Sequence, residues 1–141
     1  MEAGRENFLS QAFLQASSYL GKGKTPFFLM VEAAKIDSGG HSNSPSTIVT
    51  ELLDFDRVIG EVLSYADLHP GTLVLVTADH ETGGVTLPQG NIAKREVELA
   101  FHSDDHTGIL VPIFAYGARS GEFRGVYPNT EIFTRILKVV Q

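Results

Sequence analysis

The chain has 141 residues, of which 43% are hydrophobic, so it is long and apolar enough to bury a core. Its net charge is −6 and its 11 Lys and Arg residues are scattered, which argues against a nucleic-acid-binding surface. The absence of cysteine excludes disulfides, thiolate catalysis and cysteine-type zinc sites. Any metal must therefore be held by carboxylates and by the five histidines.

Two kinds of targeting segment are not expected. No apolar run approaches the roughly 20 residues that a membrane-spanning helix needs. Residues 1–6 are polar and lack the basic-then-apolar order of a signal peptide. The sequence thus indicates either a cytoplasmic protein or a signal peptide encoded upstream.

The first half of the chain predicts two helices around a strand. Apolar residues at helical spacing predict a helix over 6–20, which Gly21 ends. The unalternating apolar run 27–31 predicts a strand that is covered on both faces, as in a mostly parallel sheet. The Ser- and Gly-rich stretch 37–46 predicts a loop, and a second helix is expected over 45–68.

The second half alternates in the same way. Residues 72–78 (TLVLVTA) form the clearest predicted strand, and 81–110 is expected to be an irregular excursion. A buried strand over 111–116 and a final helix over 130–140 follow. This order predicts an α/β fold with a mostly parallel sheet flanked by helices, in a single partial domain spanning 1–141.

Acidic and histidine side chains follow both of the first two predicted strands. Glu32, Asp37 and His41 follow the first strand, and Asp79 and His80 follow the second. Ligands bind beyond the carboxyl ends of strands in open α/β sheets, so we expect these side chains at one sheet edge.

Asp37 and His41 are four residues apart. This spacing would place them on one face of a helix, but Gly39 and Gly40 argue against a helix here. A glycine-rich loop that curls around one ion is the alternative, and carboxylate plus imidazole suits zinc. Taken alone, the pattern is more typical of a polar surface turn.

Asp79 and His80 leave their strand in opposite directions. They can meet one metal only if the backbone turns, and the ETGG sequence at 81–84 favours such a turn. The alternative is that Asp79 caps nearby backbone amides and His80 lies on the surface.

The remaining candidates are weaker as single residues. His106 alone would be a solvated loop histidine, and this default reading is kept for His69 and His102. Glu32 directly follows an apolar run, where a buried carboxylate needs a charged or metal partner.

Taken together, these segments resemble the alkaline phosphatase family over nearly the whole chain. The resemblance is carried by FLMVEAAKIDSGGH (28–41), VTADHETGG (76–84), HTG (106–108), VPIFAYG (111–117) and NTEIF (129–133).

The resemblance implies a site with two zinc ions and one magnesium ion. The implied ligands are Asp37, His41 and His106 for the first zinc, Asp79 and His80 for the second zinc, and Glu32 for magnesium. It further implies hydrolysis of phosphate monoesters through a phosphoserine intermediate, release of inorganic phosphate, a homodimer or other self-association, and a periplasmic or secreted location.

The family's nucleophilic serine comes from an N-terminal portion that we do not find in this sequence. We therefore expect the chain to resemble the C-terminal part of such an enzyme and to be inactive alone. Ser42 and Ser103 are poor substitutes, because neither lies in a strand–turn–helix elbow. The alternative to an enzyme is a non-catalytic zinc-binding or assembly module derived from one.

Overall fold

The computed structural model describes residues 7–140, which form two compact units. One unit comprises Glu32–Asp56 and His80–Val111, and the other comprises 7–31, 57–79 and 112–140. The predicted polar N-terminus, residues 1–6, lies outside the described residues. In chain order the elements are α1 (Phe8–Leu20), α2 (Lys35–His41), α3 (Pro45–Leu68), β1 (Leu73–Thr77), β2 (Glu81–Thr82), β3 (Thr86–Asn91), β4 (Glu96–Ala100), β5 (His106–Thr107), β6 (Ile113–Gly117), the 3₁₀ turn η1 (Ser120–Phe123) and α4 (Glu131–Val140).

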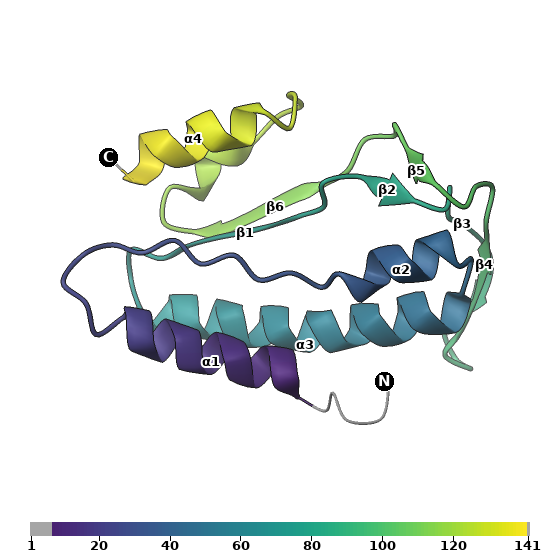
Figure 1. The fold of residues 1–141 in the computed structure, drawn as a ribbon, viewed down its shortest axis with the longest axis horizontal. Helices are drawn as coiled ribbons and strands as arrows, with labels where there is room; N and C mark the ends of the chain where they lie inside the picture. The colour runs from purple at the N-terminus through teal and green to yellow at the C-terminus, as the bar shows by residue number, and fades with distance from the viewer. Residues whose placement is uncertain (1–6, 141) are drawn as a thin grey trace. The chain divides into compact units, whose positions relative to one another are not determined.

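The second unit, 7–31, 57–79 and 112–140, is organised around apolar packing. Helix α1 runs alongside the later part of α3 (Figure 1), where the Phe13 ring meets the Tyr65 ring edge-on at 5.9 Å between centroids. Ser10 donates a hydrogen bond to Glu61 at 2.6 Å. Val58 and Val74 are also buried in this unit.

A mostly parallel sheet is not found within residues 7–140, although the mixed α/β composition is as predicted. Strands β1 and β6 pair antiparallel, with Leu75 opposite Ala115, and β2–β5 and β3–β4 are antiparallel too. An apolar run reports a preference for burial, but it carries no information about the direction of the neighbouring strand.

Two segments that were predicted to be buried strands differ in the structure. Residues 27–31 form no strand in the described chain, and Phe28 and Met30 are 69% and 77% exposed. Strand β6 forms close to its predicted place, but Phe114 is 65% exposed. The reason is the same in both cases. An apolar sequence indicates that a segment tends to be buried, but it does not indicate which other segment will pack against it.

The first unit, Glu32–Asp56 with His80–Val111, contains short elements joined by turns. Helix α3 begins with Pro45 at its first position, and the Ser44 hydroxyl accepts a hydrogen bond from the Thr47 amide at 3.3 Å. The predicted excursion contains the antiparallel hairpin β3–β4, with Gln89 opposite Glu98. Strand β2 pairs with β5 beside it.

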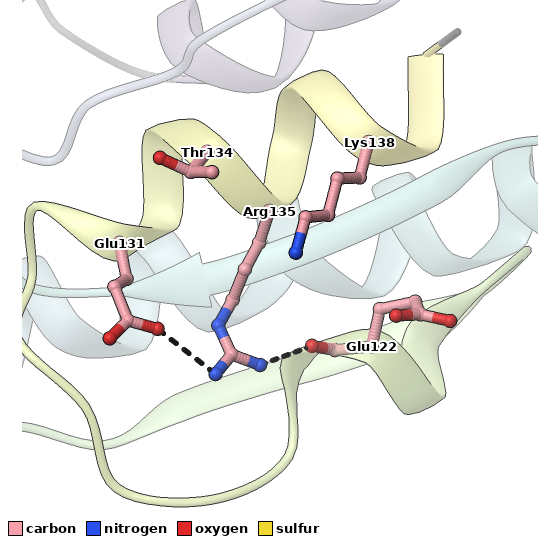
Figure 2. A pocket seen from close by; sticks show the side chains of 5 residues that line it. All are labelled: Glu122, Glu131, Thr134, Arg135 and Lys138. Carbon is pink, nitrogen blue, oxygen red and sulfur yellow. Dashed lines mark hydrogen bonds and ion pairs between the residues drawn. The ribbon is translucent and has the colours of Figure 1, made fainter.

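The C-terminal part of the second unit carries a shallow pocket of about 350 Å³ between η1 and α4 (Figure 2). Arg135 lies across it, donating to the Glu131 carboxylate at 3.2 Å and to the Glu122 carbonyl at 2.5 Å. The guanidinium also stacks over the Tyr127 ring at 3.7 Å. These contacts explain Arg135 as a structural residue that ties α4 to the turn before it.

Helix length and hydropathy limit one kind of membrane association. None of the helices within 7–140 combines the length and the apolar character that crossing a bilayer requires.

Candidate metal centre

Asp37 and His41 lie on a helix rather than on the predicted loop. Helix α2 spans Lys35–His41, so the four-residue spacing places both side chains on one face. The His41 Nε2 atom lies 3.5 Å from the Asp37 Oδ1 atom. The loop prediction was therefore wrong.

The two glycines that argued against a helix are explained by close packing. A Cβ atom at Gly39 would lie 2.8 Å from the Ile48 side chain, and one at Gly40 would lie 2.8 Å from the Thr82 carbonyl oxygen. Each glycine costs a helix about 1 kcal/mol relative to alanine. Here only glycine lets α2 approach α3 and β2 this closely, and tertiary packing outweighs the propensity.

His106 reaches the same place through the β2–β5 ladder, in which it lies opposite Thr82. The chain leaves β2 through Gly83 and Gly84, whose φ values of +94° and +57° are left-handed conformations that glycine adopts readily. The Gly83 amide then donates to the Asp105 carbonyl at 3.1 Å, beside His106. The turn expected from the ETGG sequence is thus confined to Gly83 and Gly84, since Glu81 and Thr82 form β2, and it aligns the two short strands.

Asp37, His41 and His106 form a cluster of metal-type ligands. One ligand atom from each lies within 4.8 Å of the others. The His106 Nε2 atom is 3.6 Å from Asp37 Oδ1 and 3.1 Å from His41 Nε2. The three side chains come from α2 and β5, and His106 follows His41 by 65 residues in the chain.

This donor set fits a zinc ion. Zinc–ligand distances of 2.0–2.1 Å at tetrahedral angles place two ligand atoms about 3.3 Å apart. The observed separations of 3.1, 3.5 and 3.6 Å lie around that value. One carboxylate and two imidazoles leave a fourth position for water or substrate, as in catalytic zinc sites.

A backbone carbonyl orients His41. Its Nδ1 atom lies 2.7 Å from the Asp104 carbonyl oxygen, which can only accept, so Nδ1 carries a proton and, in the neutral ring, Nε2 carries the lone pair. This is the tautomer that a metal ligand bonded through Nε2 requires. The same carbonyl, followed by the charge of Asp37, raises the pKa of His41 above its usual value.

A threonine hydroxyl orients Asp37. Thr82 Oγ1 donates to Asp37 Oδ1 at 2.6 Å, a length typical of a hydrogen bond to a carboxylate. That hydrogen bond, and then the neighbouring histidines, hold the pKa of Asp37 below its usual value. Asp37 is therefore an anion at neutral pH, as a metal ligand must be.

The other three predicted ligands are placed differently. His80 stacks on the His106 ring, with the centroids 3.5 Å apart, so it lies directly against the cluster. Glu32 and Asp79 are exposed and lie outside the three-residue cluster. Asp79 follows β1 and belongs to the second unit.

Thr82 and Glu81, which were not predicted as site residues, support the ligands. The Glu81 carboxylate accepts hydrogen bonds from the Val85 amide at 2.9 Å, from the Gly84 amide at 3.2 Å and from the Thr107 hydroxyl. Partial burial acts to raise the pKa of Glu81, but these hydrogen bonds dominate and lower it. Their position in the sequence, between His80 and the two glycines, could have indicated this role, because polar side chains there can reach both β2 and β5.

The two local serines considered as nucleophiles have other hydrogen bonds. Ser42 Oγ donates to the Ser38 carbonyl at 2.8 Å, within the last turn of α2. Ser103 Oγ accepts from the Asp105 amide at 3.0 Å. Neither contact prepares a hydroxyl for attack, because a nucleophilic serine needs a base or a metal that takes its proton.

Comparison with known proteins decides the family. The family model described as alkaline phosphatase matches residues 5–100, more than half of the chain. The chain belongs to the alkaline phosphatase family. Five of the six candidate ligands, all except His106, fall inside the matched region, as do Glu81 and Thr82.

Among curated alkaline phosphatases and their relatives, two matches are informative. The chain is 31% identical to alkaline phosphatase H of Pseudomonas aeruginosa over 148 residues, covering 94% of this chain and 31% of that protein. It is 36% identical to the streptomycin-6-phosphate phosphatase of Streptomyces griseus, covering 76% of this chain and 28% of that protein. The chain thus spans about a third of the length of these relatives.

A solved alkaline phosphatase has the same fold over the length of the chain. The enzyme from the Antarctic bacterium TAB5 matches with a TM-score of 0.91 and 45% identity, covering 99% of this chain and 43% of that one. A mutant of TAB5 alkaline phosphatase was solved with magnesium bound in its M3 site. Metal binding is therefore documented in a close structural relative.

Proposed function

We propose that this chain forms the metal-binding part of a phosphate monoester hydrolase. The single observation that carries the proposal is the cluster of Asp37, His41 and His106, whose donor atoms have the mutual separations that zinc requires. Membership of the alkaline phosphatase family and the relative that is named a streptomycin-6-phosphate phosphatase support phosphate monoesters as substrates.

A second zinc and a magnesium ion belong to the same proposal. Asp79 and His80 would hold the second zinc, and Glu32 would hold the magnesium. The stacking of His80 on His106 supports a neighbouring metal position. The magnesium bound in the M3 site of the TAB5 mutant supports a further one.

The residues of this chain would bind the metal ions and orient the ligand atoms, and the nucleophile is proposed to lie outside the 141 residues. Bound zinc and magnesium would supply the positive charge that phosphoryl transfer demands. Asp104 and Thr82 would keep the His41 and Asp37 donor atoms aimed at the first zinc. A serine hydroxyl from elsewhere in the complete enzyme would form the phosphoserine, because Ser42 donates to a backbone carbonyl.

The second candidate is a zinc-binding or assembly module without catalysis. It is favoured by the same cluster together with the hydrogen bonds of Ser42 and Ser103, which do not activate either hydroxyl. The DNA immediately upstream distinguishes the two candidates. An in-frame segment carrying an Asp-Ser-Ala-type serine would support the enzyme, whereas an untranslated region would support the module.

The metal content of the purified chain tests the cluster directly. After chelator treatment and dialysis against zinc, we expect about one tightly bound zinc per chain. His106→Ala should lose most of this zinc, because it removes one of three protein ligands. His69→Ala is the matched control, since His69 stacks on Tyr65 in the other unit and should keep wild-type zinc content. Unchanged zinc content in His106→Ala would contradict the ligand assignment.

Turnover of an aryl phosphate with zinc and magnesium present tests the missing nucleophile. We expect negligible hydrolysis by the 141-residue chain, although it binds zinc. Robust turnover that is abolished by Ser42→Ala would show that the nucleophile is local after all. In the complete enzyme we further propose a homodimer and a periplasmic or secreted location.

A further inference from the structure

The Thr82 hydroxyl lies between side chains assigned to two different zinc ions. Its Oγ1 atom is 2.6 Å from Asp37 Oδ1 and 3.2 Å from His80 Nδ1. We propose that Thr82 is a positioning residue that joins the two zinc sites and sets the tautomer of His80. This inference rests on the proposed function, because it concerns how the proposed ligands are oriented.

The direction of both hydrogen bonds follows from a count of protons. A threonine hydroxyl has one proton and two lone pairs. Asp37 is a carboxylate, which can only accept, so the Thr82 proton goes to Asp37. Towards His80 the hydroxyl can then only accept, so His80 Nδ1 must carry a proton. The chain of donation therefore runs from His80 through Thr82 to Asp37.

The consequence for His80 is a defined tautomer. A neutral imidazole with its proton on Nδ1 has its lone pair on Nε2. Nε2 is then the atom that His80 presents as a metal ligand, as His41 does under the control of the Asp104 carbonyl. Two ligand histidines thus obtain the same tautomer from different acceptors, one a carbonyl and the other a hydroxyl.

The Thr82 side chain is held in place by its surroundings. An ideal Cβ at Gly40 would lie 2.9 Å from the Thr82 methyl carbon and 2.8 Å from its Cβ, so α2 packs directly against this residue. On the other side, the β2–β5 ladder places Thr82 opposite His106. The methyl group of Thr82 packs against α2, and its hydroxyl bridges Asp37 and His80. Two substitutions can separate these two properties.

The decisive pair of variants is Thr82→Val and Thr82→Ser in the full 141-residue chain. Valine keeps the branched shape and loses the hydroxyl, whereas serine keeps the hydroxyl and loses the methyl group. Thr86→Val is a matched control, because Thr86 is an exposed threonine of the same unit that contacts His102. Circular dichroism and the thermal midpoint establish that each variant is folded.

The first readout is the tautomer of His80, measured by two-bond ¹⁵N–¹H correlation NMR on the metal-free chain. We expect a protonated Nδ1 in the wild type, in Thr82→Ser and in Thr86→Val, and a mixture of tautomers in Thr82→Val. A wild-type His80 that is protonated on Nε2 in the folded chain would overturn the proposal without any variant. An unchanged His80 tautomer in folded Thr82→Val would overturn it as well.

The second readout is zinc affinity by competition with a chromogenic chelator. Removing an outer-shell partner of a metal ligand typically costs about 10–100-fold in affinity, and we expect a loss of that size in Thr82→Val. Thr82→Ser should stay within about threefold of the wild type. Failure of the wild type to bind zinc would contradict the proposed function, while the metal-free tautomer would still decide the role of Thr82.

Discussion

The two units of the molecule hold their central side chains in different ways. In the unit built from α1, the later part of α3 and the β1–β6 pair, buried groups such as Phe13, Val58 and Val74 are apolar. In the unit that carries the candidate metal centre, hydrogen bonds fix the central side chains, as with His41 on the Asp104 carbonyl and Asp37 on Thr82. Apolar packing tolerates small rotations, whereas a metal ligand must be aimed by directional contacts.

This difference predicts that stability and metal binding can be separated by mutation. Substitutions in the apolar unit should reduce stability without altering zinc affinity of the folded chain. Substitutions among the polar contacts should reduce zinc affinity more than stability. Three substitutions with different expected losses of stability test this separation.

The largest effect is expected from Phe13→Ala. Phe13 is 6% exposed and packs on Tyr65, so its truncation leaves a cavity that should cost about 3 kcal/mol of unfolding free energy. Urea unfolding measures this loss, and Phe8→Ala, at a position 64% exposed, should cost far less. Zinc affinity of the folded Phe13→Ala chain should remain unchanged. A parallel loss of zinc affinity would break the distinction between the two units.

An intermediate effect is expected from Gly40→Ala. The added Cβ would lie 2.8 Å from the Thr82 carbonyl oxygen, and such overpacking costs about 2 kcal/mol. Because α2 and β2 would be forced apart, zinc affinity should fall as well. The control is Gly60→Ala in α3, where an added Cβ would meet no atom within 4 Å beyond its chain neighbours and its own helix backbone. This substitution should stabilise the helix by about 0.5–1 kcal/mol. Equal behaviour of the two alanine variants would refute the close-packing explanation of α2.

The smallest effect is expected from Glu81→Gln. The amide replaces one carboxylate oxygen by a donor that faces other donors, so at least one of the three accepted hydrogen bonds is lost. We expect a loss of about 1 kcal/mol in urea unfolding, because the site is only partly buried. Glu96→Gln, on the exposed strand β4, should be close to neutral. A zinc affinity that falls while stability hardly changes would sharpen the comparison further.

The elements that the sequence predicted best are those with a strong period. The helix expected over 45–68 is α3, and the strand expected over 72–78 contains β1. The strand predicted over 27–31 was wrong, because a strand needs a hydrogen-bonded partner strand that its own residues do not specify. The loop predicted in place of helix α2 was wrong for a related reason. Gly39 and Gly40 are compatible with a helix here because α3 and β2 pack closely against them.

The candidate site was predictable to the extent that ligand chemistry is local. Residue type and spacing marked Asp37 and His41 as candidates, while their assignment as zinc ligands came from the family resemblance. A turn was expected from the glycines of the ETGG sequence. The convergence of His106 on this pair was implied only by the family resemblance, because the two-residue β2–β5 ladder that produces it is too short to be recognised in a sequence. The hydrogen bonds of Thr82 and Glu81 depend on the same pairing and were missed with it.

The contact between His41 and residue 104 has an evolutionary and engineering consequence. The acceptor is a main-chain carbonyl, so exchanging the Asp104 side chain leaves it in place. What the contact requires is the path of the backbone over residues 102–106, which is held by the hydrogen bonds that Gly83 makes with His102, Ser103 and Asp105. The contact therefore constrains the length of this segment and not the identity of the side chain at residue 104. A redesigned loop of equal length should preserve the orientation of His41, while a one-residue insertion should misalign it even if every candidate ligand is retained.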